Sequence, residues 1–524
     1  MTLDAIIIGG GHNGLVCASY LAMAGMKVRL LEKNAVVGGP ASTEEFHPGF
    51  RNSVGAYTVS LLNPKVIRDL ELYQNGLTIL EREVNNFWPH PDGNYLSFLR
   101  DGDAMKAEIA LFSEQDAAAL DRYYRDIGMV ADLIRDFLLE TPPNAGGGLR
   151  DIFKAAKFAN RLRKLTIEDE RIVLDIFSKS VSDFLDFYFE NDHVKAAFAF
   201  DGIVGSYSDT RQVGTAYILV HHAIGEVNGK KGLWGHAVGG MGAITQAMAK
   251  FAMASGVEIE VDTAVTKVLV ENGKAVGVVL ANGNTLRAKR IVSNLTPTLL
   301  FNELIDAEEL PPVFSRRIKH YRSGSGTFRM NVALKGLPKF TALERQQRST
   351  PGLMTAGIVI GPTMAYLDKA YSDACEHGWS KQPIVEMLIP SVQDDSLAPA
   401  GQHVASLFCQ QFDYKIDWDR HREAAAKTII DQVEKYAPGF RDLILGTQIL
   451  SPLDLERKFG LTNGDIFHGK LTLDQLYSAR PMLGYGNYRS PIEGLYLCGS
   501  GTHPGGGVSG VPGHNAAHEI IRDG

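Results

Sequence analysis

The chain has 524 residues, of which 45% are hydrophobic and 22% charged, and its formal net charge is −7. This length exceeds one ordinary hydrophobic core, so two or more domains, some of them discontinuous, are expected. The acidic balance argues against a nucleic-acid partner, which needs a concentrated basic surface. There is no run of eighteen or more apolar residues and no charged leader before the first apolar run, so neither a membrane span nor a secretory signal is expected.

The four cysteines, Cys17, Cys375, Cys409 and Cys498, do not form a C-x-x-C pair. This spacing argues against a dithiol redox centre and against a zinc site, so no metal is expected. Four free thiols fit a reducing, cytoplasmic compartment.

The first 32 residues have the order of a dinucleotide-binding unit. An apolar strand is expected at 5–8, followed by a G-x-G-x-x-G motif, a helix that Gly25 ends, and a second strand at 27–31. A glycine motif alone is a weak signal. Its place between a strand and a helix makes a Rossmann-type unit the prediction.

Each residue of the motif has a physical task. Gly9 permits the tight turn, Gly11 lets the backbone approach a pyrophosphate, and Gly14 lets helix and strand pack closely. The free N–H groups at the start of the helix bind phosphate. Glu32, at the end of the second strand, accepts hydrogen bonds from ribose hydroxyls and repels a 2′-phosphate. The unit therefore predicts FAD or NAD rather than NADP.

A second glycine pair follows the acidic residue. The stretch VGGPAST, residues 37–43, indicates another backbone approach to the same cofactor. It resembles the flavoprotein superfamily that includes amine oxidases, protoporphyrinogen oxidases and phytoene desaturases, whose pattern usually reads G-G-R or G-G-K here. Pro40 stands in place of the basic residue, so no side-chain contact is expected from that position. The resemblance favours FAD over NAD.

A middle block returns to the same cofactor. Residues 234–244 lead into a helix at 244–256, and then into strands with hairpin turns at Asn272-Gly273 and Asn282-Gly283. In the resembled superfamily this block belongs to the FAD domain and places Val265 beside the adenine. An unrelated β-meander is the alternative interpretation.

The C-terminal block is rich in glycine. A short strand at 494–499 is followed by GTHPGGGVSGVPG, residues 501–513, and then by a helix. The glycines let main-chain N–H groups point at a ligand, and Pro512 suits the first turn of a helix. A helix N-terminus aimed at a flavin ring would stabilise the negative charge of the reduced flavin.

These segments carry a resemblance that spans essentially the whole chain. GTHPGGGVSGVPG, with GHNAAHE behind it, resembles the signature of bacterial phytoene desaturases and their relatives. Together with VVGGPASTEEFHPGF, HHAIGEVNGKKGLWGHAVGGMGAIT and GLYLCGSGTHPGGG, it is most similar to the pyridine nucleotide-disulfide oxidoreductase domain-containing protein 2 branch. The resemblance is specific in the cofactor segments and weak elsewhere.

The resemblance implies an α/β fold with a discontinuous Rossmann-type FAD-binding domain at 1–70, 231–299 and 481–524. A mixed α+β substrate domain with a helical cap is expected at 71–230 and 300–480. The residues expected to contact FAD are Gly9, Gly11, His12, Asn13, Gly14, Glu32, Lys33, Gly38, Gly39, Ala41, Ser42, Trp234, Val265, Gly499, Ser500, Gly506, Gly507, Val508 and Val511.

Helices are expected in the remaining segments at 104–111, 114–139, 151–164 and 169–189. The segment 151–164 carries several Lys and Arg residues among Phe153, Phe158 and Leu162. It has two interpretations: a helix on a membrane surface through which a lipid enters, or a solvated helix that caps the substrate domain. Whether the chain forms a homo-oligomer is left open.

Four side chains are candidates for acid–base catalysis. His503 lies in the C-terminal motif, where the resemblance places it beside the flavin ring or as an anchor of the loop. His221 and His222 stand in an apolar context, where a histidine is either a base or a satisfied core residue. Tyr57 is the fourth candidate.

The resulting prediction is an FAD-dependent oxidoreductase that dehydrogenates a small apolar organic substrate by hydride transfer from a C–H bond to flavin N5. The protein supplies orientation, dryness and electrostatics, while the flavin carries the chemistry. The alternatives are a flavin-dependent amine oxidase, an isomerase or saturase, and a non-catalytic FAD-binding interaction protein.

Overall fold

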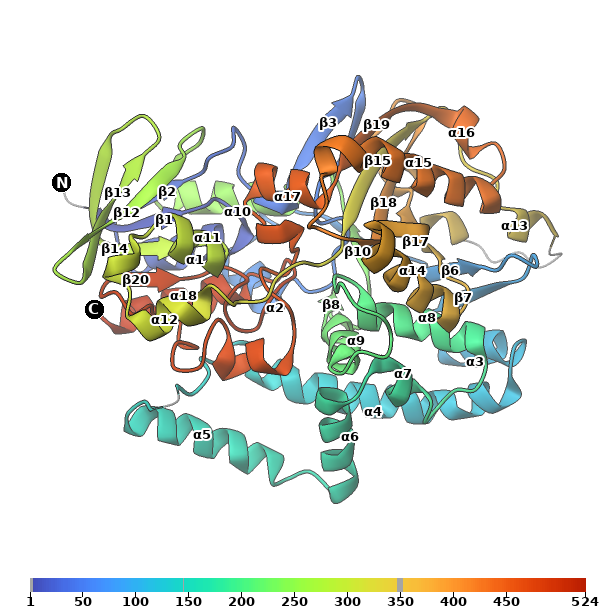
Figure 1. Cartoon of the computed structure of the whole chain (residues 1–524), viewed down its shortest axis with the longest axis horizontal. Helices are drawn as coiled ribbons and strands as arrows, with labels where there is room; N and C mark the ends of the chain where they lie inside the picture. The colour runs from blue at the N-terminus through green and yellow to red at the C-terminus, as the bar shows by residue number, and fades with distance from the viewer. Residues whose placement is uncertain (1–2, 145, 346–351) are drawn as a thin grey trace.

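The computed structural model describes residues 3–144, 146–345 and 352–524. Two seven-stranded sheets organise it, with helices packed around both (Figure 1). Both chain ends lie beside the first sheet, so this sheet is assembled from distant parts of the sequence (Figure 1).

The first sheet has the order β11-β2-β1-β14-β13-β12, and β20 pairs with β14. The strands β11, β2, β1, β14 and β20 run parallel to their neighbours along this path, whereas β12, β13 and β14 form antiparallel hairpins. This arrangement confirms the predicted α/β fold. The strands are β1 (Leu3–Ile8), β2 (Val28–Leu31), β11 (Glu258–Glu260), β12 (Val265–Glu271), β13 (Lys274–Leu280), β14 (Thr285–Ser293) and β20 (Leu495–Leu497).

The apolar run of β1 follows from burial on both faces of this sheet. Ala5 and Ile7 pack in the cluster that holds α1 (His12–Met23), α10 (Gly242–Ala254) and α18 (Val511–Arg522). Ile6 and Ile8 pack in a second cluster with the hairpin strands, α11 (Pro297–Glu303) and α12 (Pro312–Ile318). Since neither face meets water, the strand shows no polar alternation.

The second sheet has the order β19-β15-β18-β17-β16-β6-β7. One face packs on α15 (Trp418–Tyr436), and the other packs on α8 (Asp192–Ile203) and α14 (Met364–His377). Its strands are β6 (Val84–Pro89), β7 (Tyr95–Leu99), β15 (Phe328–Leu334), β16 (Gly357–Ile360), β17 (Trp379–Leu388), β18 (His403–Phe412) and β19 (Ile444–Leu450).

A layer of helices lies below the second sheet in Figure 1. It consists of α3 (Gly102–Ala110), α4 (Glu114–Leu138), α5 (Leu149–Leu162), α6 (Ile167–Ser178), α7 (Val181–Leu185) and α9 (Thr215–Ala223), together with α8. Shorter elements complete the chain: α2 (Pro64–Asp69), α13 (Thr341–Arg345), α16 (Phe440–Leu443), α17 (Pro452–Phe459), and the strand pairs β3 (Thr43–His47) with β4 (Phe50–Ser53), β5 (Ile79–Glu81) with β10 (Gly235–Ala237), and β8 (Glu226–Val227) with β9 (Lys230–Lys231).

One predicted element is wrong. The single helix expected at 169–189 is two helices, α6 and α7, because Lys179 adopts extended backbone after α6. The Ser180 hydroxyl then accepts a hydrogen bond from the Asp183 N–H and begins α7. An N-cap serine inside an apolar periodic segment is the sequence signal for this break.

The strands of the first sheet lie within the segments assigned above to the FAD domain, and those of the second sheet lie in the remaining segments. The boundaries of the two predicted domains stay a prediction. No helix within the described residues combines the length and apolarity that would be needed to cross a membrane.

Candidate cofactor and substrate site

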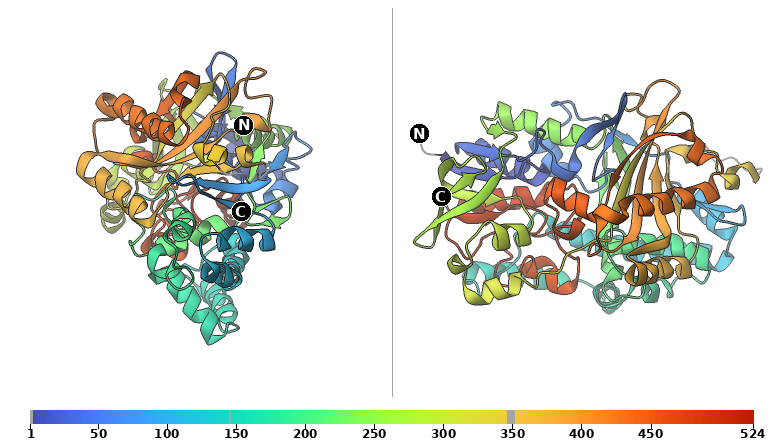
Figure 2. Two further views of the ribbon diagram at one scale, coloured as in Figure 1. Left: turned by 90° about the vertical axis from the view of Figure 1, so that its right-hand side faces the viewer. Right: turned by 45° about the horizontal axis from the view of Figure 1, so that its top comes forward.

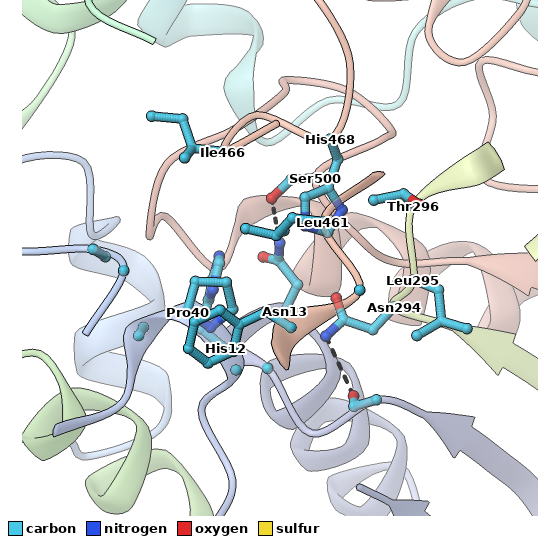
Figure 3. A pocket seen from close by; sticks show the side chains of 18 of the residues that line it. His12, Asn13, Pro40, Asn294, Leu295, Thr296, Leu461, Ile466, His468 and Ser500 are labelled. Atoms are coloured by element: carbon cyan, nitrogen blue, oxygen red, sulfur yellow. Dashed lines mark hydrogen bonds between the residues drawn. The ribbon is translucent and has the colours of Figure 1, made fainter. Parts of the chain in front are cut away.

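A cavity of about 500 Å³ lies where the two sheets face each other. The carboxyl end of β1 and the chain after β2 line one part of it, through Gly9 and Glu32. Phe408 of β18 and Tyr57 line another part. This position, beyond the carboxyl ends of parallel strands, is where open α/β sheets bind their ligands. Figure 3 shows part of the lining, which comes from several separate segments of the chain.

Glycine is required in the turn between β1 and α1. A Cβ on Gly14 would lie 2.2 Å from the Gly9 carbonyl oxygen, so helix and strand approach too closely for any side chain. The Asn294 amide donates to that same carbonyl at 3.3 Å (Figure 3). The helix begins at His12 after Gly11, without a side-chain cap, so its first N–H groups are left for an anionic ligand.

Glu32 is 4% exposed and lines the cavity. One carboxylate oxygen accepts from the Gly10 N–H at 2.7 Å, and the other accepts from the Asn34 N–H at 2.9 Å. The carboxylate therefore fixes both neighbouring turns. Each oxygen has a second lone pair for a ribose hydroxyl.

Several buried polar atoms near the cavity have no hydrogen-bond partner within the described chain. They include His12 Nε2, Asn13 Oδ1, Ser42 Oγ and His468 Nδ1. Burial lowers the pKa of His12 to about 4 and that of His468 to about 3, so both rings are neutral at pH 7. Unpaired buried groups are costly, and a polar ligand relieves that cost. The residues present therefore fit a dinucleotide such as FAD.

The C-terminal loop approaches the cavity through glycines. Gly507 has φ +95°, and a Cβ there would lie 2.3 Å from Leu61 Cδ1. Gly506 lies behind it, where a Cβ would meet Phe467 at 2.2 Å. Gly507 and Val508 line the cavity, and α18 begins at Val511. The loop thus brings bare backbone to the cavity wall, as its glycine content predicts.

The structure gathers most predicted site residues around this cavity. Those that line it are Gly9, Gly11, His12, Asn13, Glu32, Lys33, Gly39, Ala41, Tyr57, His222, Trp234, Val265, Ser500, Gly507 and Val508. The others lie outside the lining: Gly14, Gly38, Ser42, His221, Gly499, His503, Gly506 and Val511. Their predicted roles as cofactor or catalytic groups stay predictions.

His503 holds the loop to the helical layer. Its Nε2 lies 3.0 Å from the Phe137 carbonyl oxygen, and its ring packs edge-on against Tyr477. Burial lowers its pKa to about 4, so it donates to the carbonyl as a neutral ring. The geometry matches the anchoring interpretation of this residue, because its polar edge points to α4.

The two histidines of α9 occupy different places. His222 lines the cavity, stacks on Trp234 with ring centroids 6.1 Å apart, and contacts the Ile218 carbonyl through Nδ1 at 2.9 Å. His221 lines a smaller neighbouring pocket of about 160 Å³. Burial lowers the pKa of His222 to about 4 and that of His221 to about 3. Both rings are therefore neutral and poor proton acceptors at pH 7.

A buried charged cluster adjoins the cavity at Tyr57. The Tyr57 hydroxyl donates to Glu386 Oε2 at 2.5 Å. Arg82 and Asp201 line a small recess of about 10 Å³ with this pair, and the recess shares Tyr57, His222 and Trp234 with the main cavity. The cluster is thus continuous with the cavity wall.

The register of the second sheet explains this cluster. Arg329 of β15 pairs with Phe408 of β18, and Phe408 pairs with Glu386 of β17, so the three residues form one row across the sheet. The Tyr57 ring stacks on Phe408 with centroids 5.3 Å apart and lies 4.5 Å from the Arg329 guanidinium carbon. The central phenylalanine therefore seats the tyrosine between a cation and a carboxylate.

The charges in this cluster act against burial. Burial raises the pKa of Glu386, while the positive charge of Arg82, the hydrogen bond from Tyr57 and the charge of Arg329 oppose that rise. Burial also raises the pKa of Asp201 to about 7. Burial and the neighbouring Glu386 raise the pKa of Tyr57, so its hydroxyl keeps its proton at pH 7. Such perturbed groups beside a cavity are typical of functional sites.

Sequence reasoning missed four contributors to this site: Arg82, Asn294, Arg329 and Glu386. Each lies on or directly after a strand, where a polar residue in an apolar run signals a specific contact. In FRMNVAL, Arg329 and Asn331 are such residues, and in PIVEML Glu386 is one. This signal was available but did not name their partners.

The site and fold define an FAD-dependent oxidoreductase. Residues 14–350 match the flavin-containing amine oxidoreductase family, and the chain belongs to that family. It is 38% identical over 544 residues to pyridine nucleotide-disulfide oxidoreductase domain-containing protein 2 of Rattus norvegicus, covering 99% of this chain and 93% of the relative. The resemblance to that branch is thereby confirmed.

More distant relatives have more specific names. Prolycopene isomerase of Daucus carota is 26% identical over 552 residues, covering 99% of this chain and 80% of that protein. One of the subunits of limonene dehydrogenase from Castellaniella defragrans is 25% identical over 544 residues, covering 99% and 94%. The solved structure of an oxidoreductase from Methanosarcina mazei has a TM-score of 0.61 at 16% identity, covering 99% of this chain and all of that one, which shows the shared fold.

Proposed function

We propose that the protein dehydrogenates a small apolar organic molecule, forming a carbon–carbon double bond. The observation that carries this proposal is the lining beside Tyr57. Val204, Phe408 and Ile466 are joined there by Trp234 and Phe467, and the polar groups are few. Cavities that take apolar ligands combine such walls with a small number of placed polar groups. Two relatives whose names refer to limonene and prolycopene support the same substrate class.

Bound FAD would supply the electron acceptor, because oxidised flavin takes up a hydride from a C–H bond. The residues of this chain have three other tasks. The aromatic and aliphatic wall excludes water and orients the substrate. The glycine turns at Gly9 and Gly507 bring backbone to the cofactor, and the α1 N-terminus offers N–H groups to its phosphates.

The structure offers a place for the proton that desaturation also releases. We propose that Tyr57 Oη accepts it from the carbon next to the one that loses the hydride. The C–H electron pair becomes the new π bond, and the original phenol proton passes to Glu386 Oε2. The 2.5 Å contact between the two oxygens provides the path. Arg82 and Arg329 are positioning residues that keep the carboxylate ionised.

Two other reactions use the same cavity. A redox-neutral isomerisation is favoured by the identity to prolycopene isomerase, and it needs no final electron acceptor. Amine oxidation is favoured by the family name, but it gains little from the site. The buried cations Arg82 and Arg329 stand beside the carboxylate and would oppose a positively charged amine.

The test is anaerobic bleaching of the flavin absorbance by limonene, prolycopene, long-chain alcohols and primary amines. Dehydrogenation predicts bleaching by an apolar C–H donor. Bleaching by amines alone would replace the proposal by amine oxidation. Conversion of prolycopene without net bleaching and without an added acceptor would replace it by isomerisation.

A further inference from the structure

Helix α5 stands out from the rest of the helical layer. No residue of α5 is buried, although it is 14 residues long. It lies along the outer edge of the molecule, joined to α4 and α6 and away from both sheets (Figures 1 and 2). Helices of globular proteins normally bury one stripe, so a helix that buries none needs another explanation.

The exposed face of α5 is apolar in its first turns. Leu149 is 74% exposed, Ile152 62% and Phe153 74%. At 100° per residue these three lie on one side of the helix, while Phe158 and Arg161 lie on the opposite side and face the body. Phe158 packs against Phe137 with ring centroids 4.8 Å apart. The large apolar side chains of the helix start are therefore turned outward.

Basic side chains accompany this apolar face. The segment 149–164 has one acidic residue, Asp151, and six basic residues: Arg150, Lys154, Lys157, Arg161, Arg163 and Lys164. Lys157 and Arg161 pair with Glu140 on the body side. Arg150, Arg163 and Lys164 are exposed and form no ion pair with the described residues. Their charge contrasts with the net charge of −7 of the whole chain.

The same end of α4 borders a path toward the cavity. The pocket of about 160 Å³ that holds His221 is lined by Leu138 of α4 and by Leu61, Ile224 and Pro504. Leu61 also lines the main cavity. Helix α5 contacts the preceding residue of α4, Phe137. An apolar molecule that leaves a lipid phase at α5 therefore meets an apolar pocket next to the cofactor loop.

We propose that the outer face of α5 docks on an anionic phospholipid surface, with Leu149, Ile152 and Phe153 inserted at the headgroup boundary and Arg150, Arg163 and Lys164 bound to the phosphates. An amphipathic helix with large apolar residues and flanking cations is the type that lies in a membrane interface. Docking stands on the helix alone. Delivery of substrate through the side pocket rests on the proposed function.

The experiment is co-sedimentation of the FAD-loaded protein with phosphatidylcholine vesicles that contain or lack phosphatidylglycerol. We expect binding to the anionic vesicles and weaker binding at high salt. Ile152→Ser with Phe153→Ser should weaken binding by about tenfold or more. Each of Arg150→Glu, Arg163→Glu and Lys164→Glu should weaken it by at least about fivefold.

The matched control is Val313→Ser on α12, which changes a comparably exposed apolar residue outside this face and should bind as the native chain does. All substituted residues are exposed, and retention of the flavin absorbance confirms folding in each variant. Failure of the native chain to bind anionic vesicles would overturn the proposal, as would unchanged binding of the Ile152 and Phe153 variant. A dimer in light scattering that this variant dissociates, without any vesicle binding, would assign the face to a second copy instead.

These outcomes are independent of the chemistry. Vesicle binding is measured without substrate, so it can succeed when the panel of apolar donors fails to bleach the flavin. Bleaching without vesicle binding would leave the dehydrogenase standing and remove only the docking helix.

Discussion

The Tyr57 hydroxyl donates to the Glu386 carboxylate at 2.5 Å, although the two residues are 329 positions apart in the chain. The contact joins the loop after β4 to the centre of the second sheet. It also connects the cavity wall to the buried cations Arg82 and Arg329. A polar contact of this kind in an otherwise apolar wall is the chemical centre of the proposed reaction.

Removing the tyrosine hydroxyl should slow the reaction without unfolding the protein. Tyr57→Phe deletes one hydrogen bond, which costs about 1 kcal/mol of stability, but it removes the proton acceptor. We expect the rate of flavin bleaching by an apolar donor to fall by about 10²–10⁴-fold, the usual contribution of a positioned acid or base. Stopped-flow absorbance measures the rate, and Tyr73→Phe at an exposed tyrosine is the control. Equal rates in all three proteins would exclude Tyr57 from proton transfer.

Neutralising the carboxylate should affect stability as well as rate. Glu386→Gln leaves Arg82 and Arg329 as buried cations without their counter-charge, and breaking a buried pair costs about 3–5 kcal/mol. Urea unfolding of the FAD-loaded protein measures this loss. The variant should also abolish the pH dependence of bleaching that Glu386 imposes in the native enzyme. A variant as stable as the native protein would show that the two arginines do not depend on this carboxylate.

The glycine turn offers a sharp test of cofactor binding. Gly14→Ala places a Cβ 2.2 Å from the Gly9 carbonyl oxygen, so β1 and α1 must move apart at the phosphate-binding turn. We expect the purified protein to lose most of its FAD, measured as the ratio of flavin to protein absorbance. Gly128→Ala is the matched control, since Gly128 lies inside α4 with no atom within 4 Å of its added Cβ. That change should keep FAD and add about 0.5–1 kcal/mol of stability.

How much of this site the sequence predicts depends on the range of the contacts. The turn from Gly9 to Gly14 and the acidic Glu32 form within one strand–helix–strand unit, so local patterns are sufficient to place them. The position of Asn294 against Gly9 depends on β14 pairing with β1 across the chain. The row of Arg329, Phe408 and Glu386 depends on the register of three strands, which no local pattern specifies.

Side-chain direction limits the prediction in the same way. The motif around His503 predicts a glycine-rich loop, but the direction of the imidazole follows from the position of α4. The failure at 169–189 is of a different kind. The apolar pattern continues through Lys179 and Ser180, but the Ser180 cap and the packing of α7 against α8 and α9 divide the helix.

The buried histidines predict sensitivity to acid. Burial lowers the pKa of each below the ordinary 6.5, to about 3 for His221 and His468 and to about 4 for His12, His222 and His503. Between pH 6.5 and 4 the unfolded chain binds protons that the folded chain does not, so the free energy of unfolding falls as the pH falls. Asp201, with its pKa raised to about 7, acts in the opposite direction by a single proton.

Urea unfolding at about pH 7.5, 6 and 5 measures this slope. His221→Gln removes one of the titrating rings and should flatten the slope between about pH 6.5 and 4. His377→Gln, at an exposed histidine near the end of α14, is the control and should leave it unchanged. A free energy of unfolding that rises on acidification would contradict the assigned protonation states.

Arg480 makes a further prediction about the loop that covers the cavity. It is fully buried, and its guanidinium donates to the carbonyl oxygens of Ser500, Phe467, Gln475, Lys470 and Gly469. Arg480→Lys keeps the charge but cannot reach these acceptors with one ammonium group. We expect a loss of about 3 kcal/mol of stability and weaker retention of FAD. Arg316→Lys on the surface of α12 is the control, and equal flavin retention in both variants would contradict the role of Arg480.

The most direct test of the central claim is the mass of the product from an anaerobic single turnover, with limonene or prolycopene in excess over the FAD-loaded enzyme. Dehydrogenation predicts one product molecule, two hydrogens lighter than its substrate, for each flavin reduced. A product of unchanged mass, or a flavin that stays oxidised while the substrate is converted, would contradict the account.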